Sequence, residues 1–185
     1  MIPDFDLKEK GKYASWLEAL RIDRFQDLIS HVGELPYGRT SDRADFTKVL
    51  EEKRGSCSGK HALLAELAEM NGQTEIELLV GIFLMDENYA PSIGPVLQAH
   101  DLECIPEAHC YLRYQGKRYD FTTKQADVAR FEHRIVREQR CEPQQVVEWK
   151  PAIHRHYLAA WGKRNQLKIS EEELWEIRER CIAAL

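Results

Sequence analysis

The segment from residue 57 to residue 85 constrains the fold most, because a strong helix former is followed closely by a strong strand former. Residues 57–70 carry a broad apolar face of alanine, leucine and methionine, which predicts a helix. Asn71 and Gly72 follow it and predict its end. Residues 75–85, Glu-Ile-Glu-Leu-Leu-Val-Gly-Ile-Phe-Leu-Met, then predict a buried strand.

A β-hairpin is predicted after this strand. Two strand-like segments, 107–114 and 117–123, flank the dipeptide Gln115-Gly116, which suits a two-residue turn. A turn of that length pairs Tyr114 with Lys117 and fixes the register of the whole hairpin.

The predicted register brings two ionisable residues onto one face of the hairpin. Asp120 falls opposite Tyr111, and His109 lies two residues further along the same face. Diagonal neighbours of this kind have backbones about 7–8 Å apart, close enough for a carboxylate to accept a hydrogen bond from an imidazole. A slip of one residue would place them on opposite faces.

The remaining elements complete an α+β prediction. The sequence predicts further helices over 14–32, ending at Gly33, over about 45–53, from near Pro151, and after Ser170, which with Glu173 forms a capping box. Residues 86–104 are predicted to form a long loop, and the rest of the chain after the hairpin to be helical. The expected architecture is a single domain over residues 1–185, with a core over about 35–123 and a helical extension over about 124–185.

Composition and charge exclude several classes of protein. The net charge is −5, and the basic residues are interleaved with acids, so a nucleic-acid partner is not expected. The chain contains no apolar run of the roughly 18 residues that a membrane span needs. No secretory signal is recognisable, and the five cysteines are irregularly spaced, which favours reduced thiols and a cytoplasmic location.

One of these cysteines occupies a position that favours reactivity. Cys57 follows Gly55 and Ser56 at the start of the predicted helix. The first N–H groups of a helix have no partner inside the helix and, with the helix dipole, favour a thiolate and a nearby oxyanion. Together with His109 as base and Asp120 as the group that orients it, Cys57 supplies what thiol catalysis requires.

The order of a cysteine-bearing helix, a strand, a histidine strand and an aspartate strand resembles the transglutaminase-like superfamily of papain-like cysteine enzymes. The matching segments are Gly55-Ser56-Cys57, Ala62-Leu63-Leu64, Asn71-Gly72, Gly81, Glu107-Ala108-His109-Cys110-Tyr111-Leu112 and Tyr119-Asp120-Phe121-Thr122. The resemblance covers about residues 35–123. The chain departs from the family in the Cys110-Tyr111 pair after the histidine and in the long segment between the first two strands.

The resemblance implies a Cys-bearing helix packed on a small antiparallel sheet, and a Cys57–His109–Asp120 triad. It implies a thiol-dependent amide hydrolase or acyltransferase that acts on a peptide or small amide through a thioester, without a cofactor. Tyr37, Arg39 and Ser56 are candidates for contacts with the substrate or the oxyanion.

Two alternatives remain open. The fold could serve a non-catalytic interaction module, in which Cys57 would be unreactive. A zinc site could use His100, Cys104, His109 and Cys110, but adjacent residues of a strand point to opposite faces, so no metal is expected.

Overall fold

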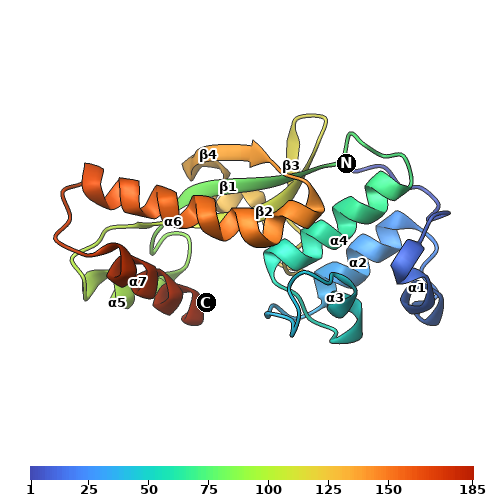
Figure 1. The fold of residues 1–185 in the computed structure, drawn as a ribbon, viewed down its shortest axis with the longest axis horizontal. Coiled ribbons are helices and arrows are strands. Elements are labelled where there is room, and N and C mark those ends of the chain that lie inside the picture. Colours follow the sequence, from blue (N-terminus) through green and yellow to red (C-terminus); the bar gives the residue numbers. More distant parts are fainter. The chain divides into compact units, whose positions relative to one another are not determined.

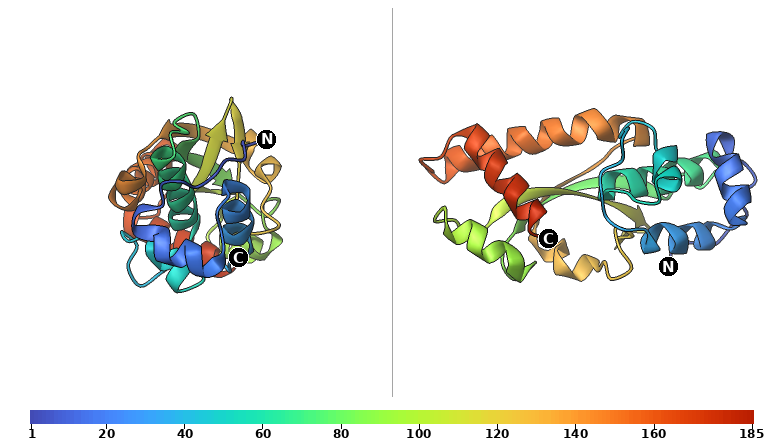
Figure 2. Two further views of the ribbon diagram at one scale, coloured as in Figure 1. Left: turned by 90° about the vertical axis from the view of Figure 1, so that its right-hand side faces the viewer. Right: turned by 90° about the horizontal axis from the view of Figure 1, so that it is seen from below.

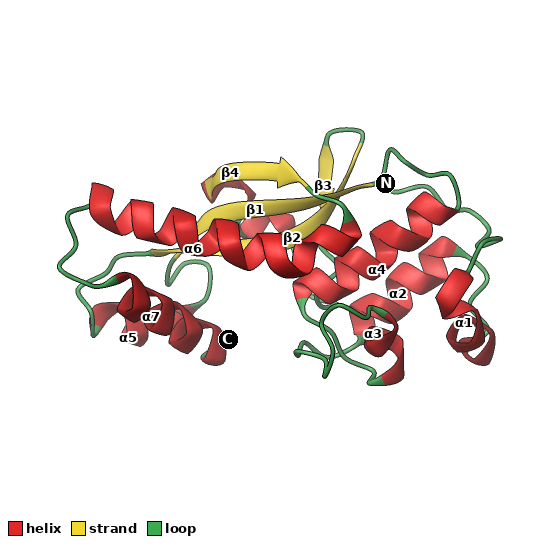
Figure 3. Cartoon of the chain, in the orientation of Figure 1, coloured by secondary structure: helices red, strands yellow, loops and turns green.

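A computed structural model describes all residues, 1–185, and shows an α+β fold with a small antiparallel four-stranded sheet. Helices and strands are separated by colour in Figure 3. The α-helices are α1 (Ala14–Leu20), α2 (Phe25–Glu34), α3 (Thr47–Glu51), α4 (Cys57–Met70), α5 (Gly94–Gln98), α6 (Val146–Arg164) and α7 (Glu171–Ala183). The strands are β1 (Glu77–Met85), β2 (Ile105–Tyr114), β3 (Lys117–Tyr119) and β4 (Ile135–Arg140). Short 3₁₀ helices include η1 (Gly11–Tyr13), η2 (Pro91–Ile93), η3 (Val128–Arg130), η4 (Glu132–Arg134) and η5 (Pro143–Gln145).

The chain divides into two compact units, each built from separate stretches of sequence. The first unit comprises Met1–Val80, Cys110–Val128 and Gln139–Val147. The second unit comprises Gly81–His109, Ala129–Glu138 and Glu148–Leu185. The single domain of the sequence analysis stays a prediction. The units do not follow its proposed division at about residue 123, because both draw residues from either side of that point.

The sheet has the strand order β3-β2-β1-β4. The predicted hairpin is confirmed (Figure 2, left), with Leu112 opposite Tyr119 and Tyr114 opposite Lys117. Gln115 and Gly116 have φ values of 47° and 74°, and a two-residue hairpin turn of type I′ requires positive φ at both of its central residues. The strand β3 is shorter than predicted, because it ends at Tyr119 and Asp120 begins a turn.

The helix α4 is the centre of the first unit and coincides with the predicted segment 57–70. It starts after Ser56, whose hydroxyl accepts a hydrogen bond from the Gly59 N–H at 3.4 Å. It ends at Asn71, and Gly72 has a φ of 76°, a conformation that glycine adopts without strain. Helices α2 and α3 pack against α4 (Figure 1), so α4 is covered on most of its sides and buries polar as well as apolar residues.

The predicted continuous helix over 14–32 is wrong. Arg21 adopts a left-handed conformation with a φ of 57° and ends α1, and α2 starts at Phe25. Gly33 does not end the region, because α2 continues through it to Glu34.

The segment 86–104 is not the long loop that its prolines and glycine suggested. It contains η2 and α5, and both helices carry proline in their first turn. A proline is well tolerated there because the first N–H groups of a helix have no acceptor within it. The same tolerance explains why α5 begins with Gly94-Pro95.

The region after the hairpin is only partly helical, so the prediction that all of it is helical is wrong. The strand β4 and three 3₁₀ helices, η3, η4 and η5, precede α6. The helix α6 begins at Val146 rather than near Pro151, which lies inside it. The last helix, α7, is confirmed: the Ser170 hydroxyl accepts a hydrogen bond from the Glu173 N–H at 3.2 Å.

The second unit holds its helices together by close packing and buried charge. The helix α5 packs against α7. Gly162 of α6 lies against Leu174 of α7 so closely that a Cβ at position 162 would approach the leucine Cδ1 to 2.7 Å. Arg178 of α7 donates two hydrogen bonds to Glu107 of β2, at 2.5 and 2.6 Å. None of the helices is both long enough and apolar enough to cross a membrane.

Candidate functional site

Cys57 is the first residue of α4, so its backbone and side chain lie where the free N–H groups of the first turn are found. The residue is buried, with an exposed fraction of 5%. Ser56, in an extended conformation, caps the helix and uses its hydroxyl for the Gly59 N–H. Cys57 therefore lies at the start of a helix, as its sequence position predicted, whereas a contact of Ser56 with a substrate or an oxyanion stays a prediction.

The loop that contains Tyr37 and Arg39 runs alongside the segment just before Cys57. Tyr37 forms a parallel bridge with Gly55. The Gly38 N–H donates to the Gly55 carbonyl, and the Gly55 N–H donates to the Pro36 carbonyl, each at 3.2 Å. Tyr37 is 48% exposed and Arg39 is also exposed, so both side chains are accessible from solvent beside the start of α4.

Gly55 is required by this arrangement. A Cβ added to it would approach the Lys60 Cγ to 2.8 Å and the Val49 side chain to 3.2 Å. The absence of a side chain at Gly55 thus leaves room for the Lys60 side chain.

Asp120 lies directly after β3 in a tight turn. Its Oδ1 accepts hydrogen bonds from the Thr122 N–H at 2.9 Å and the Thr122 hydroxyl at 2.6 Å. Its side chain is 7% exposed, and His61 Nε2 lies 3.6 Å from the same oxygen. The turn is therefore packed against α4, the helix that begins at Cys57.

Two buried residues of α4, Lys60 and His61, make this connection, and the sequence analysis did not identify either as part of it. Lys60 has no exposed surface and donates from Nζ to the Thr122 carbonyl at 2.6 Å and to the Leu35 carbonyl. His61, also fully buried, contacts the Cys57 carbonyl through Nδ1 and the Phe121 N–H through Nε2, each at 2.8 Å. A signal was present: Lys60 falls on the apolar stripe that continues with Leu63, Leu64 and Leu67.

His109 belongs to the second unit and is 8% exposed. Its ring meets Phe131 edge-on, with ring centres 5.1 Å apart, and Phe83 edge-on at 6.5 Å. Phe83 also contacts Tyr89, with ring centres 5.0 Å apart. An aromatic cluster therefore fixes the imidazole plane.

The neighbour of His109 on β2, Cys110, belongs to the first unit. Its thiol donates a hydrogen bond to the Ser58 hydroxyl of α4 over 3.5 Å. Successive side chains leave opposite faces of a strand, so the Cys110 and His109 side chains leave opposite faces of β2.

Five of the six residues predicted for the site belong to the first unit, namely Cys57, Asp120, Tyr37, Arg39 and Ser56. The sixth, His109, is placed in the second unit. The register that would make His109 and Asp120 diagonal neighbours is confirmed as far as the Leu112–Tyr119 pair.

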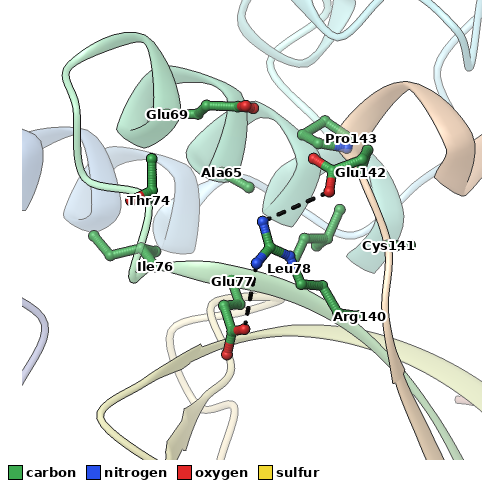
Figure 4. Close-up of a pocket in the computed structure, with 10 residues that line it drawn as sticks. All are labelled: Ala65, Glu69, Thr74, Ile76, Glu77, Leu78, Arg140, Cys141, Glu142 and Pro143. Atoms are coloured by element: carbon green, nitrogen blue, oxygen red, sulfur yellow. Dashed lines mark ion pairs between the residues drawn. The ribbon is translucent and has the colours of Figure 1, made fainter.

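Two pockets lie away from these residues. A pocket in the first unit (Figure 4) is lined by Ala65, Glu69, Thr74, Ile76, Glu77, Leu78, Arg140, Cys141, Glu142 and Pro143. Within it, the Arg140 guanidinium lies 3.6 Å from both Glu77 and Glu142. A pocket in the second unit lies between α6 and α7 and includes Arg155 and Trp175, whose charge and ring centre are 4.2 Å apart.

The residues considered for zinc do not form a ligand set. No group of three or more His, Cys, Asp or Glu side chains gathers in a way that could hold a metal ion.

Comparisons with models of protein families, with curated proteins and with solved structures each gave no match to this chain.

Proposed function

We propose that the protein is a thiol-dependent amide hydrolase or acyltransferase with a papain-like or transglutaminase-like core. Cys57 is the nucleophile, His109 the base and Asp120 the residue that orients the base. The observation that carries the proposal is the placement of Cys57 at the start of α4 while Lys60 and His61 tie the turn of Asp120 to the same helix. A nucleophile at a helix start and an anchored carboxylate are two of the three parts of such a site.

The proposed reaction uses the Cys57 thiol, the His109 imidazole and the first N–H groups of α4. The Cys57 sulfur attacks the amide carbonyl while His109 accepts the thiol proton, and the oxyanion forms beside the first N–H groups of α4. The carbon–nitrogen bond then breaks, the departing amine takes the proton from His109, and a thioester remains on Cys57. Water then releases an acid, or a second amine forms a new amide, and Cys57 recovers its proton.

The substrate in this proposal is a peptide or a small amide, and the reaction needs no cofactor. Tyr37 and Arg39 are the accessible side chains on the loop that pairs with Gly55. We propose that they contact the substrate near the carbonyl that Cys57 attacks.

A second candidate is a non-catalytic interaction module that retains the fold. The alternation of Cys110 and His109 along β2 favours it, because Cys110 is the residue that contacts α4. In this case His109 serves the aromatic cluster of Phe83 and Phe131.

Acyl transfer from p-nitrophenyl acetate separates the two candidates. The catalytic candidate predicts rapid release of p-nitrophenolate and the mass of one acetyl group on the peptide that contains Cys57. The His109→Gln variant should slow the release of p-nitrophenolate by at least about 100-fold, within the range that a general base contributes. Cys104, a half-buried thiol of the same chain whose pKa is raised by burial, is the internal control. Equal acetylation of Cys57 and Cys104, unchanged in His109→Gln, would establish the non-catalytic module.

A further inference from the structure

Lys60 of α4 is an ionisable residue in a fully buried position. Lys60 is fully buried, and an ammonium placed there loses its hydration. Its two carbonyl acceptors, Leu35 and Thr122, are neutral and lie 25 and 62 residues away in sequence. Hydrogen bonds to carbonyls alone do not supply a countercharge, so the lysine needs a nearby anion.

The turn that Lys60 binds contains such an anion. Lys60 contacts the Thr122 carbonyl, and the Asp120 carboxylate that accepts from Thr122 attracts the lysine charge. Burial lowers the pKa of Lys60 from its ordinary value of 10.5 to about 8, and Asp120 acts in the opposite direction. The lysine is therefore charged at neutral pH.

His61 is the other candidate for the cation beside Asp120, because its Nε2 lies 3.6 Å from Oδ1. Its hydrogen bonds argue against this role. Nε2 accepts the Phe121 N–H and so carries no proton, while Nδ1 lies 2.8 Å from the Cys57 carbonyl and must be the donor. The imidazole is thus the neutral Nδ1–H tautomer, so of His61 and Lys60 it is Lys60 that brings a positive charge to this turn.

We propose that Lys60 is a positioning residue, whose ammonium is the countercharge of Asp120 and holds the turn 120–122 against the helix that begins at Cys57. His61 supports the same turn through a neutral hydrogen bond. That this keeps Asp120 ionised for a reaction at Cys57 rests on the proposed function, whereas the charge pairing itself does not.

The pairing is tested by titration of the Asp120 carboxyl, followed by ¹³C NMR and assigned with Asp120→Asn. In Lys60→Met, the midpoint should rise by about one pH unit or more, as expected when a positive charge that attracts the carboxylate is removed. Lys60→Arg, which keeps the charge, should restore most of the difference. Lys124→Met is the matched control, because Lys124 follows the same turn but is exposed and pairs with Glu34 at 3.1 Å. An unchanged midpoint in Lys60→Met, or an equal shift in Lys124→Met, would overturn the proposal.

A second measurement on the unmodified protein covers the case in which the Lys60 variants do not fold. The Asp120 carboxyl resonance should show a second inflection near pH 8, where Lys60 loses its proton. Absence of that inflection would overturn the proposal. Neither measurement involves a substrate, so Lys60 can prove to be the countercharge even if Cys57 proves unreactive.

Discussion

The two units bury charge in different ways. In the second unit, Glu107 and Arg178 are 6% and 7% exposed and meet in a two-pronged ion pair between β2 and α7. In the first unit, Lys60 of α4 is fully buried, and its hydrogen bonds go to backbone carbonyls while Asp120 supplies the opposite charge. In the second unit the two charged side chains bond directly to each other. In the first unit the Lys60 ammonium instead bonds to backbone carbonyls of the candidate site.

The two units also differ in how burial and neighbouring charges shift the pKa of the buried group. Burial alone would raise the pKa of the Glu107 carboxyl, but the charge of Arg178 lowers it by more, so the pKa lies below the ordinary value. For Lys60 the loss of hydration dominates, and its pKa falls to about 8. A complete ion pair is thus stable near neutral pH, whereas Lys60 lies close to losing its charge.

The largest expected effect is on the ion pair of the second unit. Arg178→Met should lower the free energy of unfolding by about 3–5 kcal/mol, because the buried Glu107 carboxylate loses its guanidinium. Urea unfolding measures the loss. Adding Glu107→Gln should recover part of it, since the stranded charge is then removed.

The control is Glu179→Gln, which removes the carboxylate that contacts the same guanidinium at 2.6 Å but is 35% exposed. It should cost less than about 1 kcal/mol. If Arg178→Met were as mild as this control, the ion pair would not be what stabilises the second unit.

A smaller effect, and one that depends on pH, is expected for Lys60. Its pKa lies below the ordinary value of 10.5, so between about pH 8 and pH 10.5 the unfolded chain binds a proton that the folded chain does not. The contribution of Lys60 to stability therefore rises with pH in this window, by about 3 kcal/mol at most.

This slope is measured by unfolding the unmodified protein and Lys60→Met at two pH values, about pH 7.5, below the window, and about pH 10, near its upper end. Their difference in unfolding free energy should grow with pH in favour of the unmodified protein, and Lys124→Met should show no such growth. A constant difference would mean that Lys60 keeps an ordinary titration in the folded state.

The smallest expected effects concern the two serine caps, one in each unit. Ser56→Ala and Ser170→Ala should each lower the unfolding free energy by about 1 kcal/mol, because each hydroxyl accepts an N–H of the first helical turn. Thermal unfolding compares them. The Ser56 bond is 3.4 Å and the Ser170 bond 3.2 Å, so Ser170→Ala should cost slightly more; a Ser56→Ala loss above about 2 kcal/mol would show that Ser56 does more than cap α4.

The features that could be predicted from the sequence are those set by nearby residues. The limits of α4 follow from Ser56 and from Asn71-Gly72, and the hairpin register follows from Gln115-Gly116. The helix break at Arg21 has no such signal, because the residue is neither glycine nor asparagine yet adopts a left-handed conformation.

The parts that could not be predicted depend on distant contacts. The strand β4 has apolar residues only at Ile135 and Val136, too few to show a period of two. The position of Cys57 at the start of α4 was predicted, but the contacts of Lys60 form only when Leu35 and Thr122, 25 and 62 residues away, fold against it. A lysine on an apolar stripe was the one visible sign.

Whether Cys57 is an activated thiol served by His109 can be measured by the rate of its alkylation with iodoacetamide, followed for each cysteine by mass spectrometry. A series between about pH 5 and pH 9 spans the titration of activated and ordinary thiols. An ordinary thiol loses about tenfold in rate for each pH unit below its pKa, which is near 8.5. Cys57 should keep most of its rate down to about pH 6, whereas Cys104 should not, and His109→Ala should make Cys57 behave like Cys104. Parallel pH profiles for the two cysteines, unchanged by His109→Ala, would contradict this prediction.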